Sequence, residues 1–280
     1  MPYLRPRHLD DALAVLEQDG WRIAAGCTDV LPATAAKTLP GPTLDITGIE
    51  GLRGIGRGDD GWIIGATTTW TDVVRADLPP AFRGLQLAAR AVGAMQIQNC
   101  GTVGGNLCNA SPAADGVPPL LTLGAEVELR STGGARRLAL SEFITGPRRT
   151  GRHPTELMTA IHVPEHAAAG EGHFLKLGAR DYLVISIAMC AVRLVVREGT
   201  VIEAALSVGA CGPVATRLPK VEAALIGHAP DPANIADAEV FSALSPVSDI
   251  RADAAYRAAV AAEMLRRAVL AVPTAEVCAA

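Results

Sequence analysis

Apolar residues recur at helical spacing in several segments of the chain. Leucines near the N-terminus share one face of a predicted helix that has Asp10 as its N-cap. The last helix is predicted over 252–271, where Tyr256, Val260 and Met264 fall on one stripe that we expect to face a core. Further helices are predicted over 30–37, 80–92 and 219–226.

Shorter apolar runs between these helices have the length and pattern of strands. The runs 185–196 and 201–208 are joined by Glu198-Gly199 and predict an antiparallel meander. Strands are also predicted over 21–25, 62–66, 127–129, 137–140, 156–163 and 174–177. The alternation of strands and helices makes the first half α/β or α+β, and the meander that follows makes the whole chain α+β.

The chain has 280 residues, a length that suggests about two domains. The stretch 164–172 contains three consecutive alanines and predicts a linker between them. We therefore predict a first domain over 1–168, with subdomains at about 1–55 and 56–168, and a second domain over 169–280.

Composition excludes several classes of function. The net charge of −4 offers no basic surface for nucleic acid. The longest apolar stretch, 183–196, is interrupted by Ser186 and Arg193 and is too short to span a bilayer. Six cysteines occur without a Cys-x-x-Cys pair, so no zinc or iron–sulfur ligands are predicted in this chain. Scattered cysteines without a recognisable signal peptide are typical of a cytoplasmic protein.

The stretch around Thr102 is rich in glycine, and three glycines within five residues surround this threonine. Glycines allow positive φ and close approach to another molecule, and consecutive N–H groups in such turns hold anions. No Lys or Arg occurs between Arg90 and Arg130, so a phosphate would rest on N–H groups and the Thr102 hydroxyl. The alternative is a tight turn; the Asn106 and Asp115 that follow favour a ligand loop.

A second glycine turn, over 26–29, follows the short strand predicted over 21–25. Strand, glycine turn and helix in this order direct backbone N–H groups at an anion. An ordinary turn capped by Asp29 is the alternative, and the two interpretations are compatible. The Gly-x-Gly-x-x-Gly match over 56–61 is instead predicted to be a hairpin, because a strand follows it and Asp59 and Asp60 would repel a pyrophosphate.

The two loops, in this order and spacing, resemble those of the FAD-binding subunit of the molybdenum hydroxylases, the family of xanthine dehydrogenase and carbon monoxide dehydrogenase. Asn-Cys-Gly-Thr-Val-Gly-Gly-Asn at 99–106 and Ser-Pro-Ala-Ala-Asp-Gly-Val-Pro-Pro-Leu-Leu at 111–121 are similar to its second flavin loop. Residues 24–29 resemble its Ala-Gly-Gly-Thr-Asp pattern, with Cys27 where a Gly or Asn is more usual. The resemblance implies a two-part FAD-binding domain of the vanillyl-alcohol-oxidase/PCMH type, followed by a small α+β C-terminal domain with an antiparallel sheet and helices.

The resemblance also implies which residues bind FAD. Asp115 would contact a cofactor hydroxyl or else cap a helix, and Met158 would lie along the flavin or else in the core. Lys176 would lie near the cofactor, and Tyr182 would border the isoalloxazine or else be a half-buried strand residue. Arg257 and other arginines of the last helix match the family's closing helix, but we expect a solvated basic face. The implied FAD-binding residues are Ile23, Ala24, Ala25, Gly26, Cys27, Thr28, Asp29, Val30, Gly101, Thr102, Val103, Gly104, Gly105, Asn106, Asp115, Met158, Lys176 and Tyr182.

No catalytic triad, Walker motif, zinc signature or paired carboxylates can be identified, so no catalytic residue is predicted. This absence suits a flavoprotein, because the cofactor carries the chemistry. The resemblance implies partners in a dimer of heterotrimers: a small subunit with two [2Fe-2S] clusters and a large subunit with the molybdopterin cofactor. The molybdenum subunit would hydroxylate an N-heterocycle or aldehyde, and electrons would reach FAD and then NAD or another acceptor. The alternatives are a stand-alone FAD-dependent reductase of the same fold and a non-catalytic nucleotide-binding assembly protein.

Overall fold

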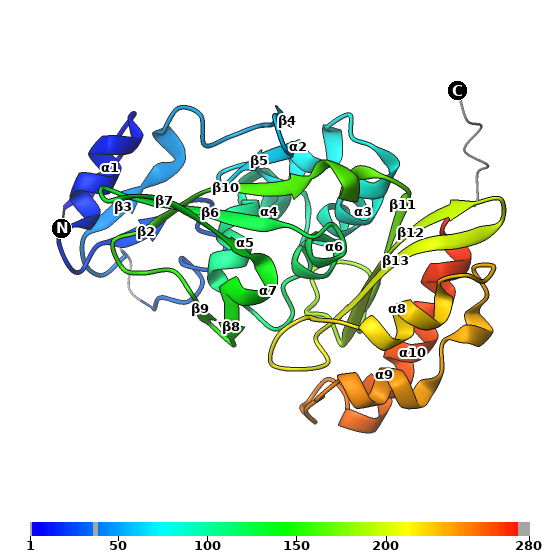
Figure 1. Cartoon of the computed structure of the whole chain (residues 1–280). Helices are drawn as coiled ribbons and strands as arrows, with labels where there is room; N and C mark the ends of the chain where they lie inside the picture. Colours follow the sequence, from blue (N-terminus) through cyan, green and yellow to red (C-terminus); the bar gives the residue numbers. More distant parts are fainter. Residues whose placement is uncertain (1, 36–38, 274–280) are drawn as a thin grey trace.

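The computed structural model describes residues 2–35 and 39–273. Figure 1 shows an elongated molecule with the N-terminal elements at one end and the C-terminal helices at the other. In the described residues the strands form sheets of three, five and four strands and one two-stranded hairpin. Helices pack against these sheets, and this arrangement confirms the predicted α+β class.

The N-terminal sheet is small and parallel. In spatial order its strands are β1 (Tyr3–Leu4), β3 (Thr43–Asp45) and β2 (Arg22–Ala24). Helix α1 (Leu9–Leu16) covers the sheet through Leu13, which packs in one cluster with Leu44 of β3. The N-cap of this helix is His8 and not the predicted Asp10, which lies in the first turn, where a negative charge suits the helix dipole.

A five-stranded antiparallel sheet forms the centre of the next part. In spatial order its strands are β4 (Ile55–Gly58), β5 (Gly61–Gly65), β10 (Leu157–Pro164), β6 (Glu126–Ser131) and β7 (Gly134–Ala139). Gly58 faces Gly61 across the β4–β5 turn, so the hairpin predicted for the Gly-x-Gly-x-x-Gly match is confirmed. Strand β10 lies between two neighbours and is buried over most of its length, which explains its long apolar run.

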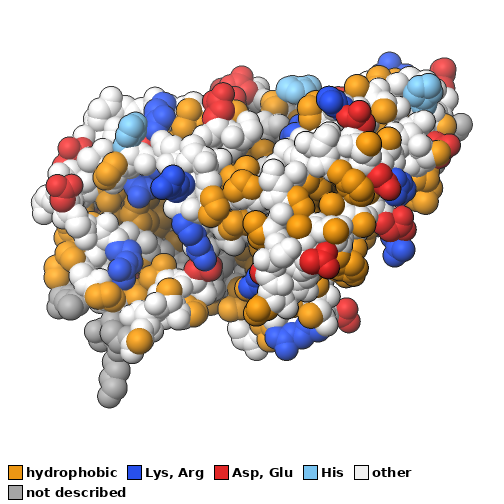
Figure 2. Space-filling model, turned by 90° about the horizontal axis from the view of Figure 1, so that it is seen from below, with side chains coloured by type: hydrophobic (Ala, Val, Ile, Leu, Met, Phe, Trp, Pro, Cys, Tyr) orange, Lys and Arg blue, Asp and Glu red, His pale blue; other side chains and the backbone are white. Residues whose placement is uncertain are grey.

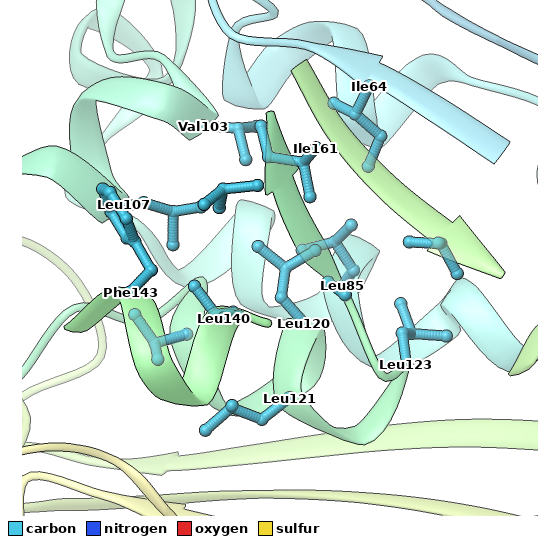
Figure 3. Close-up of a cluster of buried hydrophobic side chains, with 14 of the residues drawn as sticks. Ile64, Leu85, Val103, Leu107, Leu120, Leu121, Leu123, Leu140, Phe143 and Ile161 are labelled. Carbon is cyan, nitrogen blue, oxygen red and sulfur yellow. The ribbon is translucent and has the colours of Figure 1, made fainter. Parts of the chain in front are cut away.

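Helices of the same part pack on this sheet and form the largest core. Figure 3 shows Val103 and Leu107 of α5 pointing into one cluster with Ile161 of β10 and Leu120 of α6. The elements are α2 (Trp70–Arg75), α3 (Arg83–Ala91), α4 (Met95–Cys100), α5 (Val103–Asn109), α6 (Val117–Thr122), α7 (Leu140–Phe143), β8 (Ile144–Gly146) and β9 (Arg149–Thr150).

The C-terminal sheet is an antiparallel meander in the order β11 (Glu171–Leu177), β12 (Ala188–Arg197), β13 (Thr200–Gly209) and β14 (Thr216–Arg217). Alternate residues of β12 face opposite sides, as the strand period requires. Cys190 and Val192 pack in one cluster with helices, whereas Met189 and Ala191 pack against Ala88 of α3. The helices are α8 (Pro219–Leu225), α9 (Asp237–Ala243) and α10 (Ala254–Ala271).

The helix predicted over 30–37 does not form in residues 30–35, and residues 36–38 lie outside the described part. Turn hydrogen bonds such as that from the Leu31 N–H to the Cys27 carbonyl are present instead. These bonds continue past Pro32, where the Ala33 N–H donates to the Asp29 carbonyl at 3.3 Å, but they form successive turns and no helix.

The stretch 164–172, predicted to be a boundary linker, is not an irregular segment. Residues Glu165–Ala168 form the short 3-10 helix η3, and β11 begins at Glu171. Ala167 is buried, because η3 packs against β5 and β10. The division of the chain near residue 168 stays a prediction.

The last helix buries a different face from the predicted stripe. Met264 is buried, but Tyr256 is 49% exposed. Arg257, expected on a solvated basic face, is 3% exposed. Its guanidinium donates to the carbonyl of Ala210 at 3.1 Å and to Asp249 at 2.7 Å, whereas its Nε atom is buried without a partner among the described residues, so the charge is held through its two terminal nitrogens.

Candidate cofactor site

A cavity of about 870 Å³ lies where the N-terminal sheet, α5 and the start of β10 meet. This volume is near the upper end of the ~300–1,000 Å³ range of small-molecule and cofactor pockets. Of the predicted site residues, those that line it are Ile23, Ala25, Gly26, Cys27, Thr28, Asp29, Val30, Gly101, Thr102, Gly104, Gly105, Asn106 and Met158. The cavity therefore brings both predicted loops and Met158 together.

The loop after β2 provides a row of unused donors. Within the described residues, no hydrogen bond uses the backbone N–H groups of 26–30. Cys27 has φ of +56°, a left-handed conformation that few residues other than glycine adopt. Consecutive N–H groups around such a residue form a concave nest for an anion. Burial, with a smaller contribution from Asp45, raises the pKa of the Cys27 thiol, so this side chain remains neutral.

The second loop is built differently from the prediction. Thr102 is the N-cap of α5, and its Oγ1 accepts a hydrogen bond from the Gly105 N–H at 3.0 Å. The N–H groups of Gly101, Val103, Gly104 and Asn106 already donate to backbone carbonyls, and none of these residues has positive φ. The predicted nest and positive φ are therefore absent here, because the glycines are part of a helix start.

Close packing explains the glycines instead. A Cβ on Gly104 would lie 2.7 Å from the carbonyl oxygen of Ala66, so α5 could not approach the sheet. A Cβ on Gly26 would lie 2.0 Å from the carbonyl oxygen of Cys100, so the two loops touch backbone to backbone. Gly105 is exposed on the cavity wall, where a side chain would narrow the space.

Asn106 carries an unused acceptor at the cavity. Its Oδ1 atom is buried and has no hydrogen-bond partner within the described residues. A buried polar atom of this kind normally has a partner. The atom is covered on the side of Gly116, where an added Cβ would lie 3.0 Å from it, so a ligand in the cavity reaches it only if the Asn106 side chain turns.

The remaining predicted residues lie outside the cavity lining. Ala24 is buried within β2, and Val103 is buried in the largest core. Lys176 Nζ donates to Asp115 Oδ2 at 2.7 Å, and Ser186 donates to Asp115 Oδ1 at 2.8 Å. Burial raises the pKa of Asp115, and Lys176 opposes that shift.

Tyr182 lies on an exposed segment between β11 and β12. Its side chain is 65% exposed, and the neighbouring Leu183 is 57% exposed with φ of +51°. The Leu183 N–H donates to the Gly93 carbonyl at 3.2 Å, which fixes the segment beside the C-terminal end of α3. Val92, adjacent to Gly93, lines the cavity, so Tyr182 stands near this end of it.

Several lining residues were not predicted. Arg22 of β2, Arg148 at the β8–β9 turn and Arg152 line the cavity together with Trp70 and Asn109. No local motif marks these positions, because the fold brings them to the cavity from four separate segments. Within residues 2–35 and 39–273 no group of three or more His, Cys, Asp or Glu could hold a metal ion. In the same residues no helix is long and apolar enough to cross a membrane.

Comparison with known families explains this combination of loops and cavity. The model of the FAD binding domain in molybdopterin dehydrogenase matches residues 1–166. The model of the CO dehydrogenase flavoprotein C-terminal domain matches residues 173–272. Together they define a flavoprotein component of a molybdenum-containing dehydrogenase.

Individual relatives agree over most of their length. The carbon monoxide dehydrogenase medium chain of Afipia carboxidovorans is 34% identical over 95% of this chain and 94% of its own. The glyceraldehyde dehydrogenase medium chain of Sulfolobus acidocaldarius is 33% identical over 91% and 92%. The structure of reconstituted CO dehydrogenase from Oligotropha carboxidovorans matches with a TM-score of 0.90, 29% identity and 97% coverage of both chains. The chain thus belongs to the FAD-binding medium subunits of the molybdenum hydroxylase family, which are oxidoreductase subunits.

Proposed function

We propose that this chain carries FAD in the cavity and serves as the electron-transfer subunit of a molybdenum hydroxylase. The observation that carries the proposal is the row of unused N–H groups at 26–30, which faces a cavity of cofactor size. Family membership supports FAD as the anion-bearing ligand.

The residues present fit this cofactor. The N–H groups of 26–30 would hold the pyrophosphate, and Thr102 and Gly105 would close the cavity beside it. Asn106 would lie beside the ligand, and Met158 would contact its apolar surface. We also propose that Asp115, Lys176 and Tyr182 act at the flavin end, since Val92 and the exposed segment of Tyr182 lie at that end of the cavity.

Bound FAD would supply the redox chemistry, because a flavin exchanges electrons both singly and in pairs. We propose that a small subunit with two [2Fe-2S] clusters delivers electrons and that a large molybdopterin subunit hydroxylates an N-heterocycle or aldehyde. NAD is the proposed acceptor, and the complex is expected to be a cytoplasmic dimer of heterotrimers. The protein's own part is to bind and orient the flavin and to limit its exposure to water.

Purification of the native complex through a tag on this chain tests the proposal. Two further polypeptides should accompany it, with molybdenum, iron and FAD bound. Molybdenum hydroxylase activity should reside in the complex and be absent from the isolated chain. An isolated chain that hydroxylates a purine or an aldehyde would overturn the subunit assignment. A complex that reduces oxygen or a quinone in place of NAD would overturn only the proposed acceptor.

A further inference from the structure

The cavity carries positive charge in a chain that is negative overall. Its charged lining residues are Arg22, Asp29, Arg148 and Arg152, three cations against one anion, whereas the net charge of the chain is −4. In Figure 2, Lys and Arg side chains surround a hollow on the N-terminal side of the molecule. A cleft lined by one sign of charge concentrates its field on ions of opposite sign.

None of the three arginines is neutralised by a carboxylate. Within the described residues, no ion pair includes Arg22, Arg148 or Arg152, although many other arginines of the chain are paired. The partners of the last two are uncharged. Arg148 donates to Asn109, and Arg152 Nη1 donates to the carbonyl of Glu156 at 2.7 Å.

Hydrogen bonds of the surrounding backbone hold Arg148 and Arg152 in place. Arg148 has φ of +58°, and its N–H donates to the Ala110 carbonyl at 2.8 Å, so the β8–β9 turn is anchored to the end of α5. Arg152 lies in a segment closed by Glu156, which accepts from the His153 N–H at 2.7 Å. Backbone strain and like charges gathered at one cavity are costly without a ligand that benefits from them.

We propose that Arg22, Arg148 and Arg152 form an electrostatic recognition element for the pyrophosphate of the cofactor. This inference rests on the proposed function, since it takes FAD as the occupant. The N–H nest provides the directional hydrogen bonds, and the arginines provide the opposite charge that the nest lacks. The element favours phosphorylated flavins and adenine nucleotides over uncharged riboflavin, and it acts mainly on the association rate.

Stopped-flow binding of FAD to the full-length apoprotein tests this proposal. The double variant R148Q/R152Q should bind FAD roughly tenfold more slowly at low salt, because steering of this kind contributes ~10–10³-fold to association rates. The salt dependence of the rate should become shallower, and binding of ADP as a competitor should weaken. Riboflavin binding should be unchanged.

Arg149→Gln is the matched control, because Arg149 lies on the same turn but does not line the cavity. The control should keep the wild-type rate and salt dependence. The apoprotein of R148Q/R152Q should remain folded, although it loses hydrogen bonds such as that from Arg152 to the Glu156 carbonyl, while its stabilisation by FAD shrinks. Wild-type FAD kinetics in the double variant, or equal losses for riboflavin and FAD, would overturn the inference. A wild-type chain that binds no FAD would overturn the proposed function instead.

Discussion

Lys176 Nζ lies 2.7 Å from Asp115 Oδ2, and this buried ion pair joins the C-terminal sheet to the loop that precedes α6. Lys176 also donates to the carbonyl of Ala91 at 3.1 Å, at the end of α3. Gly116, next to Asp115, packs so closely on Trp70 that a Cβ would lie 2.4 Å from the ring. Since Trp70 lines the cavity, the pair connects the cavity wall to the C-terminal part of the chain.

Removal of the lysine should therefore destabilise the protein strongly. Lys176→Met leaves the buried Asp115 carboxylate without its cation, and a loss of about 3–5 kcal/mol in the free energy of unfolding is expected. Denaturant unfolding of the apoprotein measures it. Lys220→Met is the control, because the Lys220 side chain is 75% exposed and its pairing contributes little.

The loss should depend on pH. Burial raises the pKa of Asp115, and without Lys176 that pKa rises further, so the folded state binds a proton more readily than the unfolded state. Stability in the variant is therefore greatest at low pH and falls as pH rises through the folded pKa. The difference between wild type and Lys176→Met should shrink towards pH 4, and an unchanged difference would contradict the buried pair.

The glycines of the second loop should matter through packing. Gly104→Ala places a Cβ 2.7 Å from the Ala66 carbonyl oxygen and should shift α5, reducing FAD content severely. Gly58→Ala meets only the flexible end of Ile63 and should keep its flavin. Flavin absorbance of the two purified variants measures how much FAD each one retains. The reverse result would mean that the wrong loop has been assigned to the cofactor.

The sequence identified the two loops but misjudged how each one works. Gly101, Gly104 and Gly105 suggested positive φ, since composition does not reveal whether a glycine serves conformation or close contact. The left-handed position proved to be Cys27, at the point where the related pattern has a second Gly. The resemblance marks Cys27 as unusual at this position, and its left-handed conformation explains why related chains have a glycine there.

Substitutions at Cys27 should follow backbone strain. Cys27→Gly removes a left-handed strain of about 1–2 kcal/mol and adds chain entropy of about the same size, so stability should change little. Cys27→Val should lose stability and flavin, because a β-branched residue tolerates φ of +56° poorly. Thermal unfolding without FAD measures the stability of each variant, and the shift in melting temperature on adding FAD measures its flavin binding. Equal melting temperatures for the Gly and Val variants would contradict the strained conformation.

Glu156 should stabilise the segment that carries Arg152. It accepts two hydrogen bonds from Arg136, at 2.6 and 2.8 Å, and these hold the pKa of Glu156 below its usual value. Its stabilising effect is therefore present above the ordinary glutamate pKa and is lost as pH falls through the folded pKa. Glu156→Gln should cost about 1.5–3 kcal/mol at pH 7 and progressively less below pH ~4. A constant cost across this range would contradict the ionised pair.

Local elements could be predicted from the sequence, whereas contacts between distant segments could not. The β4–β5 hairpin, the meander and most helices follow from local periodicity and turns. Arg22, Arg148 and Arg152 could not be found in this way, because no local motif marks them and Arg22 lies far along the chain from the other two. Arg257 is predicted to face solvent because an arginine in a helix usually lies there, yet its terminal nitrogens find partners inside, at the Ala210 carbonyl and Asp249.

Binding of FAD to the isolated full-length chain tests the central claim most directly. Titration of the apoprotein, followed by flavin absorbance and calorimetry, should show one FAD per chain and much weaker binding of FMN, which lacks the pyrophosphate. Acid precipitation should release the flavin completely, because no covalent link is expected. A chain that refuses FAD under these conditions, or that binds FMN equally well, would contradict the assignment of the cavity.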